Sequence, residues 1–325
     1  MRRRPVFRYD RPRFSTQDLQ ALAEIPALAL MALALPERRW RDACRWIESV
    51  KSRGTWAEPR RVAATAAGAL GLAAPAFDAG RFAVVYAANR IEQFTQGLRD
   101  VLPGGWRATI VLDGERRLAD ARAGGRGAIV WVAPFAFASL AAKRAIAQAG
   151  HPISHVSRPG HGYSTSRFGV AVLNPLRVAA ENRWLAERLV IPEGHAGNIM
   201  MRAQRALREN RVVSITAGGW EGQRIATVRL FGQPMDIAVG APGLARLAGA
   251  PLLPVFAVRD ESGDTIRVVV DEPIPVAADG DRDIALEAAA QAYASRVEPW
   301  IRRHPDQWRE WNSLGRSGPE ATTAT

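Results

Sequence analysis

One uninterrupted apolar segment limits the possible folds more than any other feature. Residues 128–135 read Ala-Ile-Val-Trp-Val-Ala-Pro-Phe, without a charged or polar side chain. Such runs are typical of strands that are buried on both faces of a parallel sheet. A helical pattern over 139–149 follows, and further apolar strands are predicted at 152–157, 212–216 and 251–259. This alternation predicts an α/β fold, with a mixed, largely parallel sheet that helices cover on both faces.

The remaining periodic segments complete this prediction. Helices are predicted at 62–72, 81–102, 182–189, 199–209, 241–248 and 283–303, and strands at 108–112, 225–231 and 265–271. We expect three parts: a helical N-terminal region over 1–61 that associates with a membrane, an α/β domain over 62–314, and a polar tail over 315–325 that is disordered. Hydrophobic residues make up 47% of the chain, which is enough for a substantial core.

The charge of the chain is uneven. The formal net charge is +12, and residues 1–61 hold 14 Lys and Arg against 7 Asp and Glu. A basic stretch of this kind favours an anionic partner, either membrane headgroups or nucleic acid. Because the sequence contains no nucleic-acid recognition motif and no aromatic-basic alternation, we expect no nucleic-acid partner.

An uncharged run of 11 residues lies at 25–35. It is too short to span a membrane, which takes roughly 20 apolar residues. Acidic residues precede it and no small-residue cleavage site follows it, which argues against a cleaved signal. Two alternatives stay open, a buried core helix or an interfacial helix on a membrane. The residues that favour the membrane alternative follow directly: Arg38, Arg39, Trp40, Arg41, Arg45 and Trp46.

Metal and cofactor sites are not indicated. Cys44 is the only cysteine, so no intrachain disulfide is possible. His151 and His155 have the spacing of a helical zinc motif, but Pro152 stands in place of the glutamate and the segment is predicted as a strand. We therefore expect no metal and no cofactor.

Several short motifs occur in a recognisable order over residues 125–308. They are Gly125-Arg126-Gly127, Ser157-Arg158-Pro159, Leu230-Phe231-Gly232-Gln233-Pro234, Gly249-Ala250-Pro251 and Pro305-Asp306-Gln307-Trp308. Together they resemble the lauroyl/myristoyl acyltransferases of lipid A biosynthesis, in the lysophospholipid acyltransferase-like superfamily. The resemblance implies transfer of a fatty acyl group from an acyl carrier protein or acyl-CoA thioester to a hydroxyl of a membrane glycolipid. It also implies a peripheral location on the cytoplasmic face of the bacterial inner membrane.

The catalytic dyad of that family is missing from its usual place. The family pattern is a histidine, four residues and then an aspartate or glutamate, and the matching positions here are Pro134 and Ser139. Proline offers no base, and serine offers no permanent negative charge to orient an imidazole. Two hypotheses follow: an acyltransferase with a rearranged active site, or a catalytically silent relative that binds lipid or acyl carrier.

Three residues are candidates to replace the dyad. The loop after strand 152–157 carries Arg158 and His161, and Glu221 follows strand 212–216. Ligands gather at the carboxyl ends of parallel strands, so Pro134 and His161 are expected at the same sheet edge. His161 is either the catalytic base or an ordinary loop histidine. Arg158 matches a family position and either binds a phosphate or thioester carrier or forms a structural ion pair.

Overall fold

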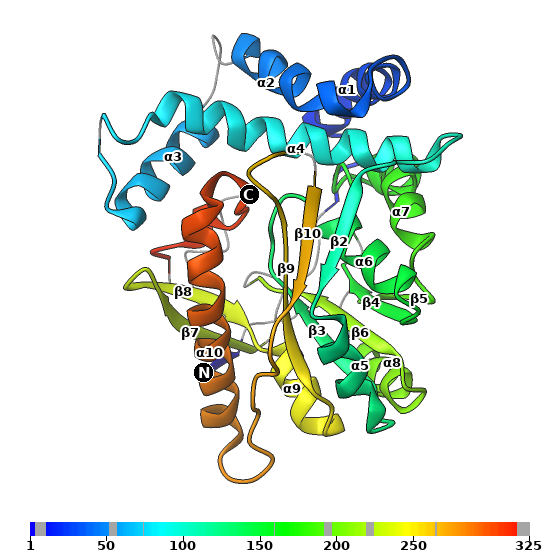
Figure 1. Ribbon diagram of the computed structural model, residues 1–325, viewed down its shortest axis with the longest axis vertical. Coiled ribbons are helices and arrows are strands. Elements are labelled where there is room, and N and C mark those ends of the chain that lie inside the picture. Colours follow the sequence, from blue (N-terminus) through cyan, green and yellow to red (C-terminus); the bar gives the residue numbers. More distant parts are fainter. Residues whose placement is uncertain are drawn as a thin grey trace.

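The computed structural model (Figure 1) describes residues 1–3, 11–51, 57–73, 75–158, 160–191, 197–218, 224–263 and 265–316. Its helices are α1 (Thr16–Ala34), α2 (Trp40–Lys51), α3 (Ala57–Leu70), α4 (Ala79–Val101), α5 (Glu115–Ala123), α6 (Ala138–Gln148), α7 (Asn174–Asn182), α8 (Gly197–Arg208), α9 (Gly240–Ala248) and α10 (Arg282–Arg303). Its strands are β1 (Arg2–Arg3), β2 (Thr109–Asp113), β3 (Ala128–Val132), β4 (Ile153–Ser157), β5 (Glu187–Val190), β6 (Val212–Thr216), β7 (Arg224–Leu230), β8 (Gln233–Ala238), β9 (Leu252–Arg259) and β10 (Thr265–Val270). Short 3-10 turns lie at Glu37–Arg39, Pro305–Gln307 and Trp311–Ser313, and a π-helical turn at Gly169–Leu173 leads into α7.

The main sheet has seven strands in the order β2-β10-β9-β3-β6-β4-β5. Strands β9, β3, β6, β4 and β5 are parallel, whereas β10 pairs antiparallel with β9 and parallel with β2. This confirms the predicted largely parallel α/β sheet. The carboxyl ends of the parallel strands point toward the end of the molecule that α4, α1 and α2 cover (Figure 1).

Helices flank the sheet, as predicted. One group comprises α6 and α7, which contact each other, and a second comprises α8, α9 and α10, which contact one another in turn. Every residue of β3 and β9 is buried, as expected for strands covered on both faces. Gly127 enters β3 with a φ of +63°, and a Cβ atom there would lie 2.5 Å from the carbonyl oxygen of Arg211. Glycine is therefore required at this turn.

A second, three-stranded sheet has the order β1-β7-β8 and packs against α10. Strand β8 pairs with β7 across the turn at Gly232, and the sequence patterns had not indicated it. The helix predicted at 182–189 is wrong: α7 ends at Asn182, and β5 pairs parallel with β4 from Glu187 onward. The helix begins earlier because Asn174-Pro175 supplies a proline in the first helical turn.

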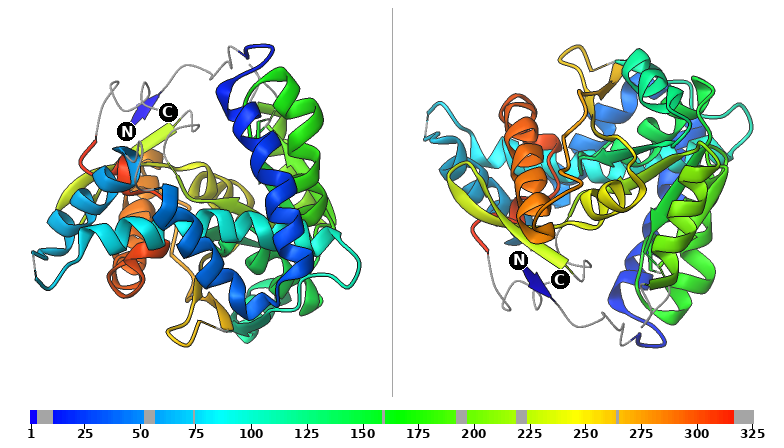
Figure 2. Two further views of the ribbon diagram at one scale, coloured as in Figure 1. Left: turned by 90° about the horizontal axis from the view of Figure 1, so that it is seen from above. Right: turned by 90° about the horizontal axis from the view of Figure 1, so that it is seen from below.

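The N-terminal helices lie over α4, and α1 also contacts the turn at Gly169–Leu173 beside α7 (Figure 2). The apolar run at 25–35 lies almost entirely within α1, and it combines features of a buried core helix with features of an interfacial helix. Leu28, Met31 and Ala32 are buried against the core, whereas Leu30 and Leu33 are 67% and 61% exposed. Among the described residues, no helix has the length and apolar character to cross a membrane.

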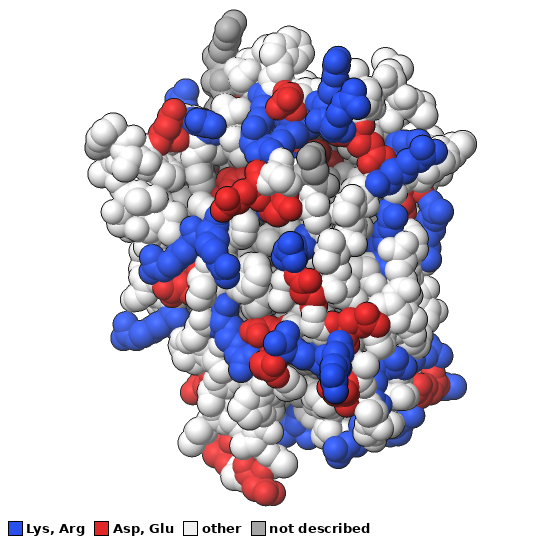
Figure 3. Space-filling model, viewed as in Figure 1, with Lys and Arg blue, Asp and Glu red and all other residues white. Residues whose placement is uncertain are grey.

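The tryptophans after this run differ from each other. Trp46 is 68% exposed, but Trp40 is 1% exposed and its indole donates to the carbonyl oxygen of Leu35. The expectation that Trp40 reaches a headgroup layer is therefore wrong, because its ring is part of the core. On the face drawn in Figure 3, basic side chains are interspersed with acidic ones, so the net charge does not form a single patch there.

Candidate functional site

Glu181 is the centre of a buried polar cluster behind the carboxyl ends of β4 and β5. Its side chain is 2% exposed. Oxygen Oε1 accepts from Ser139 Oγ at 2.6 Å and lies 2.8 Å from His161 Nε2. Oxygen Oε2 accepts from Lys143 Nζ at 3.1 Å and from Arg188 Nη2 at 2.7 Å. One carboxylate thus joins four side chains that come from α6, β5 and the loop after β4.

Ser139 and His161 both contact the carboxylate of Glu181 in this arrangement. Ser139 is the residue that the resemblance is expected to place at an acid position, and the carboxylate beside it belongs to Glu181 of α7. The expected histidine at position 134 is absent, yet an imidazole contacts the same carboxylate at 2.8 Å. The cluster therefore contains a histidine–glutamate pair that the linear pattern does not reveal.

The loop that carries His161 is held by Asn174, at the start of α7. Its Oδ1 accepts from the backbone N–H groups of Tyr163 and Ser164, and its Nδ2 donates to the carbonyl oxygen of Ser164. A Cβ atom at Gly162 would lie about 2.1 Å from Cγ of Asn174, so only glycine permits this close approach. The histidine is thus placed by a well-bonded loop.

The N-terminus of α1 holds the same loop from the other side. Backbone N–H groups of Arg167 and Phe168 donate to carbonyl oxygens of Pro12 and Arg13. Ser166 Oγ donates to the buried Asp18 at 2.9 Å. The rings of Phe14 and Phe168 also pack together, with centroids 5.3 Å apart.

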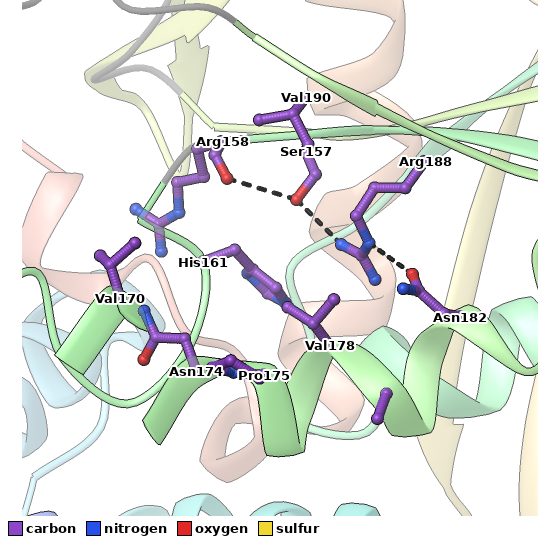
Figure 4. Close-up of a pocket in the computed structure, with 11 residues that line it drawn as sticks. Ser157, Arg158, His161, Val170, Asn174, Pro175, Val178, Asn182, Arg188 and Val190 are labelled. Atoms are coloured by element: carbon purple, nitrogen blue, oxygen red, sulfur yellow. Dashed lines mark hydrogen bonds between the residues drawn. The ribbon is translucent and has the colours of Figure 1, made fainter. Parts of the chain in front are cut away.

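A pocket of about 380 Å³ opens in front of His161 (Figure 4). Its polar wall is formed by Ser157, Arg158, His161, Asn174, Asn182 and Arg188. Its apolar wall is formed by Val170, Pro175, Val178, Ala179 and Val190. The guanidinium groups of Arg158 and Arg188 lie on either side of His161 (Figure 4). The pocket thus combines a cationic, hydrogen-bonding wall with an apolar one.

The electrostatics of the cluster fix its protonation. Burial alone would raise the pKa of Glu181, but Lys143, His161 and Arg177 hold it well below its usual range. Burial lowers the pKa of His161 to about 4, although Glu181 opposes the shift. At neutral pH the cluster therefore holds an ionised glutamate and a neutral histidine. The contact with Glu181 places the imidazole proton on Nε2, which leaves Nδ1 as the basic nitrogen.

Pro134 lies in a different and much smaller cavity. Its neighbours there include Ala217, Tyr293, Trp308 and Glu310, and the cavity of about 10 Å³ holds at most one water molecule. Burial raises the pKa of Glu310. His161 does not line this cavity. The structure thus does not bring His161 beside Pro134, although both follow parallel strands at one sheet edge.

The loop around Pro134 is fixed by the C-terminal segment. The backbone N–H of Ala136 donates to the carbonyl oxygen of Gln307, and that of Arg309 donates to the carbonyl oxygen of Pro134. The rings of Phe135 and Trp308 pack edge to face, with centroids 5.4 Å apart. Residues of the Pro-x-Gln-Trp motif therefore hold the loop that contains Pro134 in place.

The three residues proposed from sequence have different outcomes. Arg158 and His161 line one pocket, and Glu221 lies outside the described residues. Sequence reasoning missed Glu181, Lys143 and Arg188. One available signal was the i, i+4 spacing of Arg177 and Glu181 after the Asn-Pro helix start, which the misplaced helix at 182–189 obscured.

Comparison with known proteins agrees with this fold. A family model described as bacterial lipid A biosynthesis acyltransferase matches residues 172–311, from the turn before α7 to Trp311. The match includes Glu181 and Arg188, and it starts after Pro134, Ser139, Arg158 and His161. A comparison with curated proteins gave no match. Over residues 172–311, the chain is similar to the bacterial lipid A biosynthesis acyltransferase family, which supports an acyltransferase function in general terms.

Proposed function

We propose that the protein transfers a fatty acyl group from a carrier thioester to a hydroxyl of a membrane glycolipid, with His161 as the base and Glu181 as the group that orients it. The observation that carries this proposal is the 2.8 Å contact between His161 Nε2 and Glu181 Oε1 beside the pocket of about 380 Å³ that His161 lines. A buried carboxylate that orients an imidazole suits general-base catalysis of acyl transfer to a hydroxyl.

The reaction has two parts. His161 Nδ1 takes the proton from the acceptor hydroxyl, while the hydroxyl oxygen attacks the thioester carbonyl carbon. The carbon–sulfur bond of the tetrahedral intermediate then breaks, and the proton on the imidazolium passes to the departing thiolate. Glu181 stabilises the imidazolium between these steps, and Arg158 and Arg188 supply donors for the developing oxyanion.

Attachment to the membrane belongs to this proposal. Helix α1 lies at the end of the molecule where the parallel strands terminate, and it exposes Leu19, Leu22, Leu30 and Leu33. Arg38 and Arg39, just after it, are also exposed. Exposed leucines beside arginines suit peripheral docking on an anionic surface, such as the cytoplasmic face of a bacterial inner membrane. An acyl carrier protein or acyl-CoA would serve as donor.

A catalytically silent relative is the second candidate. It is favoured by the absence of a histidine at position 134 and by the closed, mostly apolar cavity around Pro134. Such a protein would bind lipid or acyl carrier in the His161 pocket without turnover.

An acyl-transfer assay separates the two candidates. Membrane lipid extracts are incubated with several acyl carriers and the full-length protein, and the products are identified by mass spectrometry. We expect transfer by the wild type and a loss of about 10²–10⁴ in His161→Ala, the range for removal of a general base. Arg158→Ala should mainly weaken substrate binding. His304→Ala is the matched control, because that residue lies outside the pocket. Full activity of folded His161→Ala would remove His161 from the mechanism, and no transfer by the wild type under any condition would favour the silent relative.

A further inference from the structure

The Glu181 cluster holds more positive than negative charge. Lys143, Arg188 and Arg177 all form ion pairs with Glu181, with Arg177 Nε at 3.8 Å from Oε1. Among the described residues, Glu181 is the carboxylate common to these three pairs. The side chains of Lys143, Arg188 and Arg177 are only 6%, 10% and 18% exposed. Among the residues that the structure describes, one carboxylate against three cations leaves an excess of two positive charges in a poorly solvated place, which is costly unless an anion is nearby.

The pocket presents this excess on its surface. Arg188 forms part of the wall and Glu181 does not, and no carboxylate occurs among the lining residues that the structure describes. Arg188 is held in place from two sides, since Nη1 donates to Ser157 Oγ at 2.9 Å and Nε donates to Asn182 Oδ1 at 2.7 Å. The guanidinium of Arg158 faces the same space from the end of β4 (Figure 4). Two planar cations thus converge on one cavity whose opposite wall is apolar.

We propose that this pocket binds a phosphate group, carried either by the pantetheine-type arm of the acyl donor or by the sugar headgroup of the acceptor. Its catalytic role rests on the proposed function, whereas the binding itself does not. Phosphate matches the site because its oxygens accept paired N–H groups from guanidinium forks, and because its charge offsets the excess of two. The apolar wall suits the uncharged body of an ester next to the phosphate.

Phosphate binding would also adjust the base. Arg177 and Lys143 contribute to the low pKa of His161, and Arg158 and Arg188 face the same pocket as the ring. An anion between Arg158 and Arg188 would offset these cations, so the pKa of His161 would rise toward neutrality. A base works best when its pKa is near the working pH, so binding of the phosphate would activate the histidine that it lies beside.

Calorimetry on the full-length protein tests the binding. The probes are inorganic phosphate, pantetheine 4′-phosphate against pantetheine, and glucose 1-phosphate against glucose. We expect each phosphate to bind and each phosphate-free partner to bind at least 10-fold more weakly. Arg158→Gln should weaken phosphate binding by about 10-fold or more. Arg116→Gln, whose side chain is 93% exposed on α5, should leave it unchanged. Tighter binding of one ester than of inorganic phosphate assigns the phosphate to the donor or to the acceptor, and either result supports the site.

Two results would overturn the proposal. One is equal affinity for the phosphorylated and phosphate-free probes, and the other is unchanged phosphate affinity in Arg158→Gln. A histidine NMR titration gives an independent readout, because saturating phosphate should raise the pKa of His161 in the wild type and not in Arg158→Gln. Since neither experiment requires turnover, phosphate can bind even where acyl transfer fails, and acyl transfer can persist where phosphate binding fails. The two proposals are thus refuted separately.

Discussion

Replacing Glu181 by glutamine should cost far more stability than replacing a surface carboxylate. The change keeps the shape of the side chain but leaves Lys143, Arg177 and Arg188 without their shared counter-charge. Breaking a buried ion pair by removing one partner costs about 3–5 kcal/mol. That is a large part of the roughly 5–15 kcal/mol that holds a typical domain folded. With an m value near 3 kcal/mol/M, a loss of about 4 kcal/mol lowers the urea midpoint by about 1.3 M.

The assay is urea unfolding at pH 7, followed by tryptophan fluorescence. The matched control is Glu272→Gln, because Glu272 also accepts from an arginine, at 2.6 Å from Arg117 Nε, but is 60% exposed. Exposed pairs of this kind contribute about 0–1 kcal/mol. Adding Lys143→Met to Glu181→Gln should restore part of the loss, since it removes one uncompensated cation. If the two glutamine variants lose equal stability, Glu181 does not neutralise the cluster and the charge argument for the pocket is wrong.

Three further predictions concern pH, the family dyad and the membrane. The pKa of His161 is about 4 in the folded protein and about 6.5 in the unfolded chain, so the unfolded state binds more protons between these pH values. The stability that this histidine contributes is therefore fully present above about pH 6.5 and falls as the pH drops toward 4. The slope of unfolding free energy against pH should be shallower in His161→Asn by up to about 1.4 kcal/mol per pH unit in that window, and identical slopes would contradict the lowered pKa. The double change Pro134→His with Ser139→Glu should not improve acyl transfer, and it should lower stability relative to Pro134→His alone. Ser139 Oγ lies 2.6 Å from Glu181 Oε1, so a second carboxylate at position 139 would repel the first. A large gain in transfer would instead support the silent relative. Replacing Arg38, Arg39, Arg41 and Arg45 with glutamine should weaken binding to anionic liposomes by on the order of 1 kcal/mol for each exposed arginine. Liposome sedimentation at physiological salt measures this binding, and a wild type that does not bind such liposomes would show that the interfacial hypothesis is wrong.

The fold was largely predictable because its signals are local. The buried parallel strand β3 (Ala128–Val132) lies in an uninterrupted apolar run, which is typical of such strands, and α4 and α10 are long enough to show their helical pattern clearly. Strand β5 was missed since only one of its four residues, Leu189, is buried, so it lacks the apolar run of a central strand. An edge strand such as β5 forms because it pairs with its neighbour β4, and the hydrophobic pattern of its own residues does not reveal this pairing.

The site was predictable only in part. His161 and Arg158 were accessible from the sequence because they follow a buried strand, where ligands gather in α/β folds. Glu181 was not, because its role depends on the packing of α7 against α6, which brings it to Ser139 and Lys143, 42 and 38 residues away in the chain. The family resemblance directed attention to Pro134 and Ser139, whereas the imidazole and the carboxylate that we propose as the base and its orienting group come from the loop after β4 and from α7.

The attachment of residues 11–18 to the His161 loop affects how deletion experiments are interpreted. Pro12 and Arg13 accept hydrogen bonds from Arg167 and Phe168, and Asp18 accepts one from Ser166. A shortened protein that starts within α1 loses these supports together with the exposed leucines. An inactive truncation would therefore not distinguish a missing membrane anchor from a collapsed histidine loop. Point changes on the outer face of α1, such as Leu30→Ser and Leu33→Ser, leave the loop contacts in place and isolate the contribution of the lipid surface.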